Sequence, residues 1–269
     1  MVSGMRVSGS VRGVLIVALV AAGASAILFR PSGIADVRAQ QNDARKPVLV
    51  ELFTSEGCSS CPPADTLLAK MDSMQVVPGA QVVVLSEHVT YWNHDGWFDP
   101  YSLDAMTARQ QDYANRFGIP SSYTPQAVVD GSSQMVGSDV RKLVAAVEQA
   151  ASAAKPDLAI MDAQWAGNAV KFSVKGAANP KTELMAALAE DSVESAVAHG
   201  ENAGRNLHHV AVVRVMAEMG KGADDGRGLT LKAPPAGKAA PTGPMRLVVF
   251  VTDRHSGHVL TVAERTISR

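Results

Sequence analysis

The stretch that decides the fold runs from Pro47 to Pro63 and reads PVLVELFTSEGCSSCPP. Residues 48–54 are apolar and rich in β-branched side chains, which predicts a buried strand. The two prolines that end the stretch suit the first turn of a helix, and apolar residues recur at helical spacing from Leu67 to Met74. The only two cysteines of the chain, Cys58 and Cys61, are therefore expected in a strand-to-helix turn.

A Cys-x-x-Cys pair in this position has three interpretations. A helix N-terminus stabilises a thiolate at Cys58, and a two-residue spacer lets the second thiol close on the first, which favours a redox-active dithiol. A structural zinc site normally needs four ligands, and no second cysteine pair exists. An inert structural disulfide would close a loop too short to add much stability. The redox interpretation is the main hypothesis, with the other two left open.

The next hundred residues predict alternating strands and helices. Strands are expected over 81–86, 127–129 and 134–136, the last two joined by a turn at Asp130-Gly131. Helices are expected from about Ser102 to Phe117 and from 139 to about 154. The predicted order is β-α-β-α-β-β-α with a mixed sheet.

This order, with the cysteine pair after the first strand and Thr124-Pro125 before the third, resembles the thioredoxin fold over residues 46–155. Within that fold, the chain resembles the secreted thioredoxin-like proteins of domain-of-unknown-function family 1223. The stretches that carry the resemblance are Val50 to Pro63, His88 to Trp92, Gly96-Trp97, Asp99-Pro100, Thr107 to Gln110, Tyr123 to Gly131, Gly200 to Arg205 and Val212 to Arg214.

The resemblance implies a cis peptide bond at Thr124-Pro125 that faces the cysteines. Such a turn would hold the backbone of an extended substrate, with Pro125 in a catalytic role and Thr124 in substrate binding. The alternative is an ordinary trans proline before a strand.

Glu51 is the one carboxylate in the first predicted strand, seven residues before Cys58. Buried beneath the cysteines, it would accept the proton of Cys61 and so count among the catalytic residues. The alternative places its side chain at the sheet edge, because a buried unpaired carboxylate is costly.

An aromatic loop from His88 to Tyr101 follows the second predicted strand. Tyr91, Trp92 and Trp97 are expected either to pack on the sheet as a lid or to form a substrate-binding wall. His88 offers a third metal ligand beside the two cysteines, as in a copper carrier, although a lone histidine is more often simply hydrogen-bonded.

Residues 156–269 change character to short alternating apolar segments separated by Gly, Asn and Pro, which predicts an all-β sandwich-like domain. A long loop is expected from Gly220 to Gly243. The histidines of this half lack metal-ligand spacing and are interpreted as surface or turn residues: His199, His208, His209, His255 and His258. No P-loop or dinucleotide fingerprint is present in the sequence.

Residues 1–39 read as an export signal, with basic Arg6 and Arg12 before an apolar run of 16 residues from Val14 to Phe29. Small residues offer two cleavage sites, after Ala26 and after Ala39. Cleavage is expected after Ala39, where the chain turns polar, and an uncleaved membrane anchor is the alternative. Either reading places the rest of the chain in the periplasm or outside the cell.

The amino-acid composition excludes several classes of protein. The 269 residues are 46% apolar and 19% charged with a net charge of −1, which excludes a polytopic membrane protein, a disordered chain and a strongly basic nucleic-acid binder. The sequence therefore predicts an exported thiol-disulfide oxidoreductase that needs no cofactor and acts on protein thiols or disulfides. The alternative is a non-catalytic binding module or copper carrier that uses Cys58, Cys61 and His88.

Overall fold

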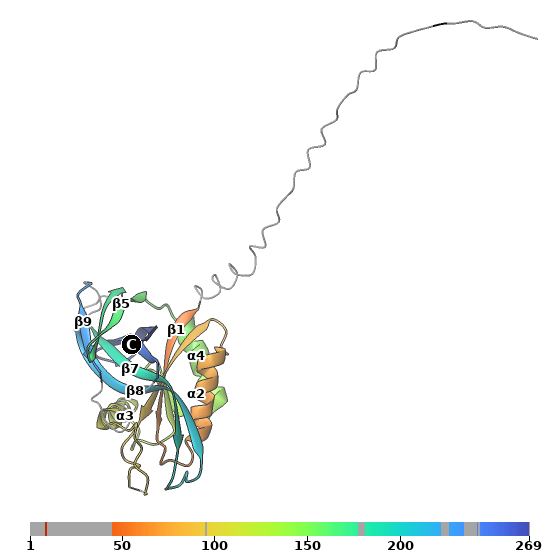
Figure 1. The fold of residues 1–269 in the computed structure, drawn as a ribbon, viewed down its shortest axis with the longest axis vertical. Coiled ribbons are helices and arrows are strands. Elements are labelled where there is room, and N and C mark those ends of the chain that lie inside the picture. The colour runs from red at the N-terminus through yellow and green to blue at the C-terminus, as the bar shows by residue number, and fades with distance from the viewer. Residues whose placement is uncertain are drawn as a thin grey trace, which may run out of the picture. The chain divides into compact units, whose positions relative to one another are not determined.

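The computed structural model describes residue 9 and residues 45–94, 96–176, 181–221, 226–233, 241 and 243–268. Residues 40–269 form one compact unit (Figure 1). The predicted leader, residues 1–39, lies outside the described residues apart from residue 9. In chain order the elements are β1 (Lys46–Thr54), α2 (Pro62–Met74), β2 (Ala80–His88), α3 (Asp104–Phe117), β3 (Gln126–Val129), β4 (Ser133–Val136), α4 (Val140–Ser152), β5 (Leu158–Ala166), β6 (Ala169–Gly176), β7 (Thr182–Ala196), β8 (Asn206–Lys221), β9 (Leu229–Lys232), β10 (Met245–Asp253) and β11 (Val259–Ile267).

The strands form a large mixed sheet of eight strands and a smaller sheet of three. The large sheet has the order β11-β10-β7-β8-β2-β1-β3-β4, and the small one has the order β5-β6-β9. β1 pairs in parallel with β2 and antiparallel with β3. On its other side β2 pairs in parallel with β8 through one residue pair, Ser86 and Val212.

The predicted fold class, a thioredoxin-like α/β domain followed by an all-β sandwich-like domain, is wrong. The structure is mostly β, and β7, β8, β10 and β11 continue the sheet that β1 and β2 begin. Apolar alternation reports which face of a strand is buried, but it does not report the strand with which it pairs. The sequence therefore suggested a separate sandwich for strands that extend the first sheet.

The two faces of the large sheet are covered by different helices near the cysteine turn (Figure 1). Leu68 of α2 and Leu143 of α4 pack with Leu52 of β1 in the main core. The next residue of β1, Phe53, points to the opposite face and packs with Tyr113 of α3. The turn after β1 is thus held between α2 and the aromatic residues around α3.

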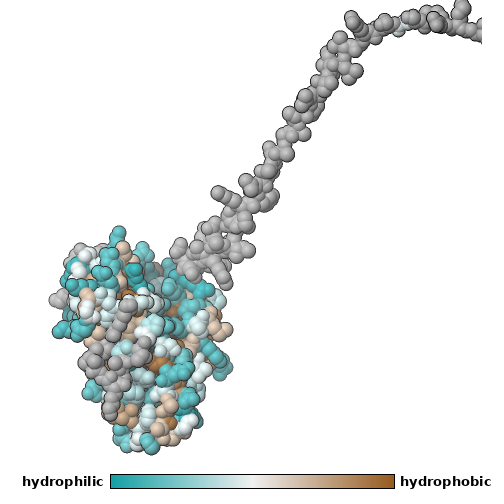
Figure 2. All heavy atoms as spheres, in the orientation of Figure 1, coloured by the Kyte–Doolittle hydropathy of each residue, from teal (hydrophilic) through white to brown (hydrophobic). Residues whose placement is uncertain are grey.

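A second core lies between the small sheet and the C-terminal strands, where Phe172 packs with Leu188 and Leu247. Strand β9 falls inside the segment expected to be a long loop from Gly220 to Gly243. On the face shown in Figure 2, hydrophobic residues are scattered among hydrophilic ones over the described part of the chain. None of the described helices is long and apolar enough to cross a membrane.

Candidate functional site

Cys58 and Cys61 form a disulfide in the turn between β1 and α2. The S–S distance is 2.16 Å and the two Cα atoms are 5.4 Å apart. Cys61 is the N-cap residue of α2, whose first turn contains the prolines predicted to start it. Both cysteines are fully buried, whereas Ser59 and Ser60 between them are exposed. The bond therefore lies just beneath the surface, with the two serines facing solvent.

Trp92 lies against the cysteine turn. A Cβ atom added at Gly57 would come within 3.0 Å of both the Cβ and the carbonyl oxygen of Trp92, so the absence of a side chain there allows the close approach. The indole Nε1 of Trp92 donates a hydrogen bond to Thr124 Oγ1 at 2.7 Å. The bond between Thr124 and Pro125 is cis. The structure thus brings Trp92 and Thr124, two predicted substrate-binding residues, together beside the turn.

Pro125 packs against the first turn of α2. A Cβ atom added at Gly137 would lie 3.2 Å from the Cβ atoms of both Pro125 and Ala64. The backbone N–H of Ala64 donates to the carbonyl oxygen of Cys61 at 2.8 Å. The predicted catalytic proline therefore lies near Ala64, in the helical turn that begins at Cys61.

A loop from the far half of the sequence binds the backbone of the cysteine turn, and this loop, residues 197–205 between β7 and β8, is called the covering loop below. Asn202 in this loop is fully buried, and its Nδ2 donates to the carbonyl oxygens of Glu56 at 2.8 Å and of Cys58 at 2.9 Å. Glu201 Oε2 accepts from the backbone N–H of Ser59 at 3.1 Å, and hydrogen bonding from Ser59 lowers the pKa of the Glu201 carboxyl. The covering loop thus holds the backbone of the cysteine turn directly.

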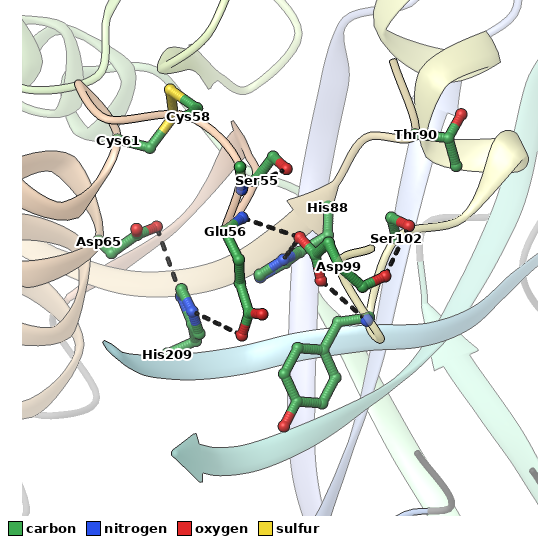
Figure 3. Close-up of polar contacts among 12 residues, drawn as sticks. Ser55, Glu56, Cys58, Cys61, Asp65, His88, Thr90, Asp99, Ser102 and His209 are labelled. Atoms are coloured by element: carbon green, nitrogen blue, oxygen red, sulfur yellow. Dashed lines mark hydrogen bonds and ion pairs between the residues drawn. A yellow bond between two sulfur atoms is a disulfide. The ribbon is translucent and has the colours of Figure 1, made fainter. Parts of the chain in front are cut away.

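Three buried ionisable side chains, Glu56, Asp65 and His209, lie below the disulfide in the view of Figure 3 and are called the acid–histidine cluster. His209 Nδ1 is 3.7 Å from Asp65 Oδ1, and His209 Nε2 is 3.6 Å from Glu56 Oε1. These separations are too long for good hydrogen bonds, so the contacts are ion pairs. Burial opposes the charged imidazole, but the two carboxylates outweigh it and raise the pKa of His209 to about 10.

His88 and Asp99 extend this arrangement on the side of the aromatic loop. His88 Nδ1 is 2.7 Å from Asp99 Oδ2, which also accepts from the backbone N–H of Glu56 at 2.9 Å. Although burial opposes its ionisation, contact with His88 and these hydrogen bonds lower the pKa of Asp99. The ring of His88 packs edge-on against that of His209, with centroids 4.6 Å apart. Trp97 Nε1 donates to Glu56 Oε2 at 2.7 Å, so this predicted substrate-binding residue holds one carboxylate of the cluster.

Glu51 is fully buried in a central strand rather than at a sheet edge. Its carboxylate accepts from Arg109 Nε at 2.7 Å and from Tyr113 Oη at 2.6 Å, both on α3. Burial and the neighbouring Glu51 carboxylate raise the pKa of Glu87 well above its ordinary value. Glu51 is therefore engaged on the α3 face, and its role as proton acceptor stays a prediction.

Tyr91, a predicted substrate-binding residue, also contacts α3: its hydroxyl donates to Gln110 Oε1 of that helix at 3.1 Å.

The alternative metal site would need Cys58, Cys61 and His88 to face one ion. Within the described ranges, no group of three or more His, Cys, Asp or Glu side chains is arranged to hold a metal ion. The two sulfur atoms are bonded to each other, and His88 Nδ1 is engaged with Asp99. Metal binding would require the disulfide to be reduced first.

Sequence reasoning missed most of the acid–histidine cluster. His209 was interpreted as a surface or turn residue, but it lies in β8 with its side chain fully buried. Asp65 follows Cys61 by four residues on a predicted helix, and this spacing places both on one face. That signal was available in the sequence. Nothing local to His209 or Asn202 reports their contacts with the cysteine turn.

The comparisons with known proteins confirm one prediction from the sequence, the resemblance to domain-of-unknown-function family 1223. The profile of the DUF1223 family, described as proteins of unknown function, matches residues 49–252. The crystal structure of protein AGR_C_4864 from Agrobacterium tumefaciens is similar, with 28% identity, a TM-score of 0.58 and coverage of 82% of this chain and 94% of that chain.

Other comparisons add little. A β-glucuronidase structure from Bacteroides uniformis has 9% identity and a TM-score of 0.15, with coverage of 42% of this chain and 12% of that chain, a similarity too low to indicate a shared fold. No curated protein matches the chain.

Proposed function

We propose, for a chain that belongs to the DUF1223 family, that the Cys58–Cys61 pair exchanges disulfides with the thiols of partner proteins. The observation that carries the proposal is the position of the bond. It closes a dithiol at the start of α2 and lies beside three buried ionisable groups. Burying such groups costs free energy, and perturbed titratable residues gather where they serve chemistry.

The exchange starts from the disulfide that the structure contains. A partner thiolate attacks Cys58 Sγ, the bond to Cys61 breaks, and its electron pair leaves with Cys61 Sγ as a thiolate. A second partner thiolate then attacks the partner sulfur of the mixed disulfide and releases Cys58. Two partner thiols are oxidised to one disulfide, and their two protons end on the cysteines of the reduced protein. The reverse sequence reduces a partner disulfide.

The burial of Cys58 and Cys61 means that a partner thiolate cannot reach the disulfide unless part of the surrounding structure moves. Because Cys58 is fully buried, the partner has to displace the covering loop or the segment that contains Trp92 before attack. Trp92 and Thr124, with Tyr91 and Trp97 nearby in the sequence, would then contact the backbone of the partner. The same proposal places the partner outside the cytoplasm, and N-terminal sequencing of the mature protein would test the predicted cleavage after Ala39.

Trapping of mixed disulfides tests the proposal. The two single-cysteine variants, Cys58→Ser and Cys61→Ser, are incubated with oxidised glutathione and with a disulfide-linked peptide, whose disulfide supplies the second sulfur of the adduct. The wild type is incubated with reduced glutathione, which attacks its disulfide, and all adducts are counted by intact-mass spectrometry. We expect Cys61→Ser to accumulate the adduct at Cys58, because the resolving thiol is missing, and Cys58→Ser to form little. Ser59→Ala, which keeps both cysteines, serves as the matched control.

A structural disulfide would behave differently. It would resist glutathione in the folded protein and would be reduced only after unfolding, and the two single-cysteine variants would trap equally. Either result would refute the exchange proposal.

A further inference from the structure

The tip of the covering loop, residues 198–205, has little apolar surface with which to hold itself in place. Its sequence reads AHGENAGR, in which the apolar side chains are those of two alanines. Asn202 is buried, whereas the other residues of the tip are exposed or half-buried. Hydrophobic contact therefore contributes little to its attachment, because that contribution scales with the apolar area removed from water. The tip is attached to the cysteine turn by the hydrogen bonds of Asn202 and Glu201.

The tip has a fixed base and contains two glycines at which it can turn. At the base, the backbone N–H of Val197 donates to the carbonyl oxygen of Arg205 at 3.0 Å, and that of Gly204 donates to the carbonyl oxygen of Val197 at 2.8 Å. Gly200 and Gly204 have φ angles of 77° and 79°, values that favour glycine. Hinges are usually a few residues at the end of an element that absorb changes in φ and ψ. The tip can therefore swing away from the cysteine turn while β7 and β8 stay paired.

The groups of the cysteine turn that the tip occupies are all main-chain groups. The carbonyl oxygens of Glu56 and Cys58 accept from the side-chain amide of Asn202. The backbone N–H of Ser59 donates to the carboxylate of Glu201. A side-chain amide N–H and a carboxylate oxygen have the same hydrogen-bonding roles as the N–H and C=O groups of a peptide backbone. The tip thus presents to the turn the donor and acceptor groups that the main chain of an extended polypeptide would present.

We propose that the tip occupies the binding site of the partner, and that an extended segment of an unfolded polypeptide displaces it and takes over its hydrogen bonds. The inference rests on the proposed function and names its substrate class, unfolded chains that contain cysteine. An unfolded chain has free N–H and C=O groups, whereas a folded protein has already paired nearly all of those that it buries. Because the carbonyl oxygen of Cys58 is one of the bound groups, the segment runs beside the residue that its thiolate attacks.

Recognition through the main chain fits a partner whose sequence varies. Backbone hydrogen bonds give affinity without reading side chains, as in the addition of a peptide strand to a sheet edge. Displacement of the tip exchanges one set of hydrogen bonds for another of the same kind, so no buried group of the turn is left unsatisfied when the partner is bound. In the free protein, the tip keeps the carbonyl oxygens of Glu56 and Cys58 satisfied. The contacts of the tip therefore define which groups a partner has to supply.

Peptides with one cysteine test the proposal on the wild-type protein. One peptide has an ordinary backbone, a second is N-methylated on both sides of its cysteine, and a third carries the same methyl groups far from the cysteine. Loss of the Cys58–Cys61 disulfide is followed with each peptide and with 2-mercaptoethanol, at equal thiolate concentrations. Each hydrogen bond lost slows the reaction about 2- to 10-fold, so we expect that decrease for the second peptide alone.

Variants of the tip provide a second measurement. Glu201→Ala and Asn202→Ala each remove hydrogen bonds that hold the tip, and the rate rises with the fraction of molecules whose turn is open. We expect the ordinary peptide to gain about 2- to 10-fold for each bond removed and 2-mercaptoethanol to gain less, because it cannot use the freed groups. Glu201→Gln, which keeps an acceptor oxygen, should lie closer to the wild type than Glu201→Ala. Glu148→Ala, on the exposed side of α4, is the matched control.

The two measurements separate failure of this inference from failure of the proposed function. Glu201 is exposed, so Glu201→Ala tests the tip even where Asn202→Ala fails to fold. Equal rates for the first two peptides, or equal gains of peptide and 2-mercaptoethanol in Glu201→Ala, would overturn the inference while leaving the exchange proposal intact. Failure of every thiol to reduce the disulfide of the folded wild type would overturn both.

Discussion

The side-chain amide of Asn202 donates a 2.9 Å hydrogen bond to the backbone carbonyl oxygen of Cys58, a residue 144 positions away in the sequence. A second bond from the same nitrogen reaches the carbonyl oxygen of Glu56 at 2.8 Å. One buried side chain thus fixes the backbone on the N-terminal side of the disulfide. The covering loop is therefore part of the cysteine site.

Replacing Asn202 with alanine should loosen this cover. Two buried carbonyl oxygens lose their donor, and each unsatisfied buried group costs about 1–3 kcal/mol. We expect a lower free energy of unfolding in urea and faster reduction of the disulfide by dithiothreitol in the folded protein. Asn168→Ala, in an exposed turn, is the control for losing an asparagine. Unchanged reduction kinetics in Asn202→Ala would show that the covering loop does not limit access.

Gly57→Ala should force apart the cysteine turn and the aromatic loop. The added Cβ would meet Trp92 at 3.0 Å, and overpacking of this kind typically costs about 1–3 kcal/mol. A change in tryptophan fluorescence should accompany the loss of stability, because Trp92 has to move. Gly228→Ala is the matched control, since nothing lies within 4 Å of the position of its added Cβ. Equal stabilities of the two variants would contradict the close packing of Trp92.

The stability contributed by His209 should depend on pH in one direction. Its folded-state pKa of about 10 lies above the ordinary value of about 6.5 for histidine. The charged form therefore stabilises the fold fully below about pH 6.5, and this contribution is lost as the pH rises through about 10. Urea unfolding of wild type and His209→Gln should differ by a few kcal/mol near pH 6, and the difference should shrink toward pH 10.

The exposed His199 provides the control for this pH dependence, because His199→Gln removes a histidine without disturbing the acid–histidine cluster. Its unfolding free energy should follow that of the wild type throughout. A stability difference for His209→Gln that stays constant or widens with rising pH would mean that His209 is not charged in the folded protein.

Arg109→Met should destabilise the α3 face of the sheet. Arg109 pairs with the buried carboxylates of Glu51 and Glu87, and leaving buried charge without its partner costs about 3–5 kcal/mol. Adding Glu51→Gln should recover part of the loss, because the second change removes the uncompensated charge. The exposed Arg141→Met on α4 is the control. A double variant as unstable as the sum of its single changes would argue against direct coupling.

Local signals predicted the strand, turn and helix around the two cysteines well. The prolines and the spacing from Leu67 to Met74 identify α2, which the structure places at Pro62–Met74. The C-terminal strands show the limit of such signals. β7 is one long strand, Thr182–Ala196, where the sequence predicts short segments, and its partners β8 and β10 lie on either side of it in the large sheet. Strand pairing depends on contacts between distant segments, which periodicity does not encode.

The candidate site likewise combines residues with local sequence signals and residues brought together only by long-range strand pairing. The turn that holds Cys58 and Cys61 depends on adjacent residues, so the sequence located it. The position of Asp65 four residues after Cys61 is an equally local signal, whereas Glu51 stands out in the sequence as the one carboxylate in an apolar strand. His209 and Asn202 reach the turn only because β8 pairs with β2 through Ser86 and Val212, a contact without a local signature.

The distance of 144 residues between Cys58 and Asn202 also orders events during synthesis. Ribosomes add about 5–20 residues per second, so the cysteines emerge roughly 7 to 30 seconds before the residue that encloses them. During that interval both cysteines belong to a chain that still lacks the hydrogen bonds from Asn202 to the carbonyl oxygens of Glu56 and Cys58. The cysteine turn therefore cannot take its final, enclosed form until the segment between β7 and β8 has been made.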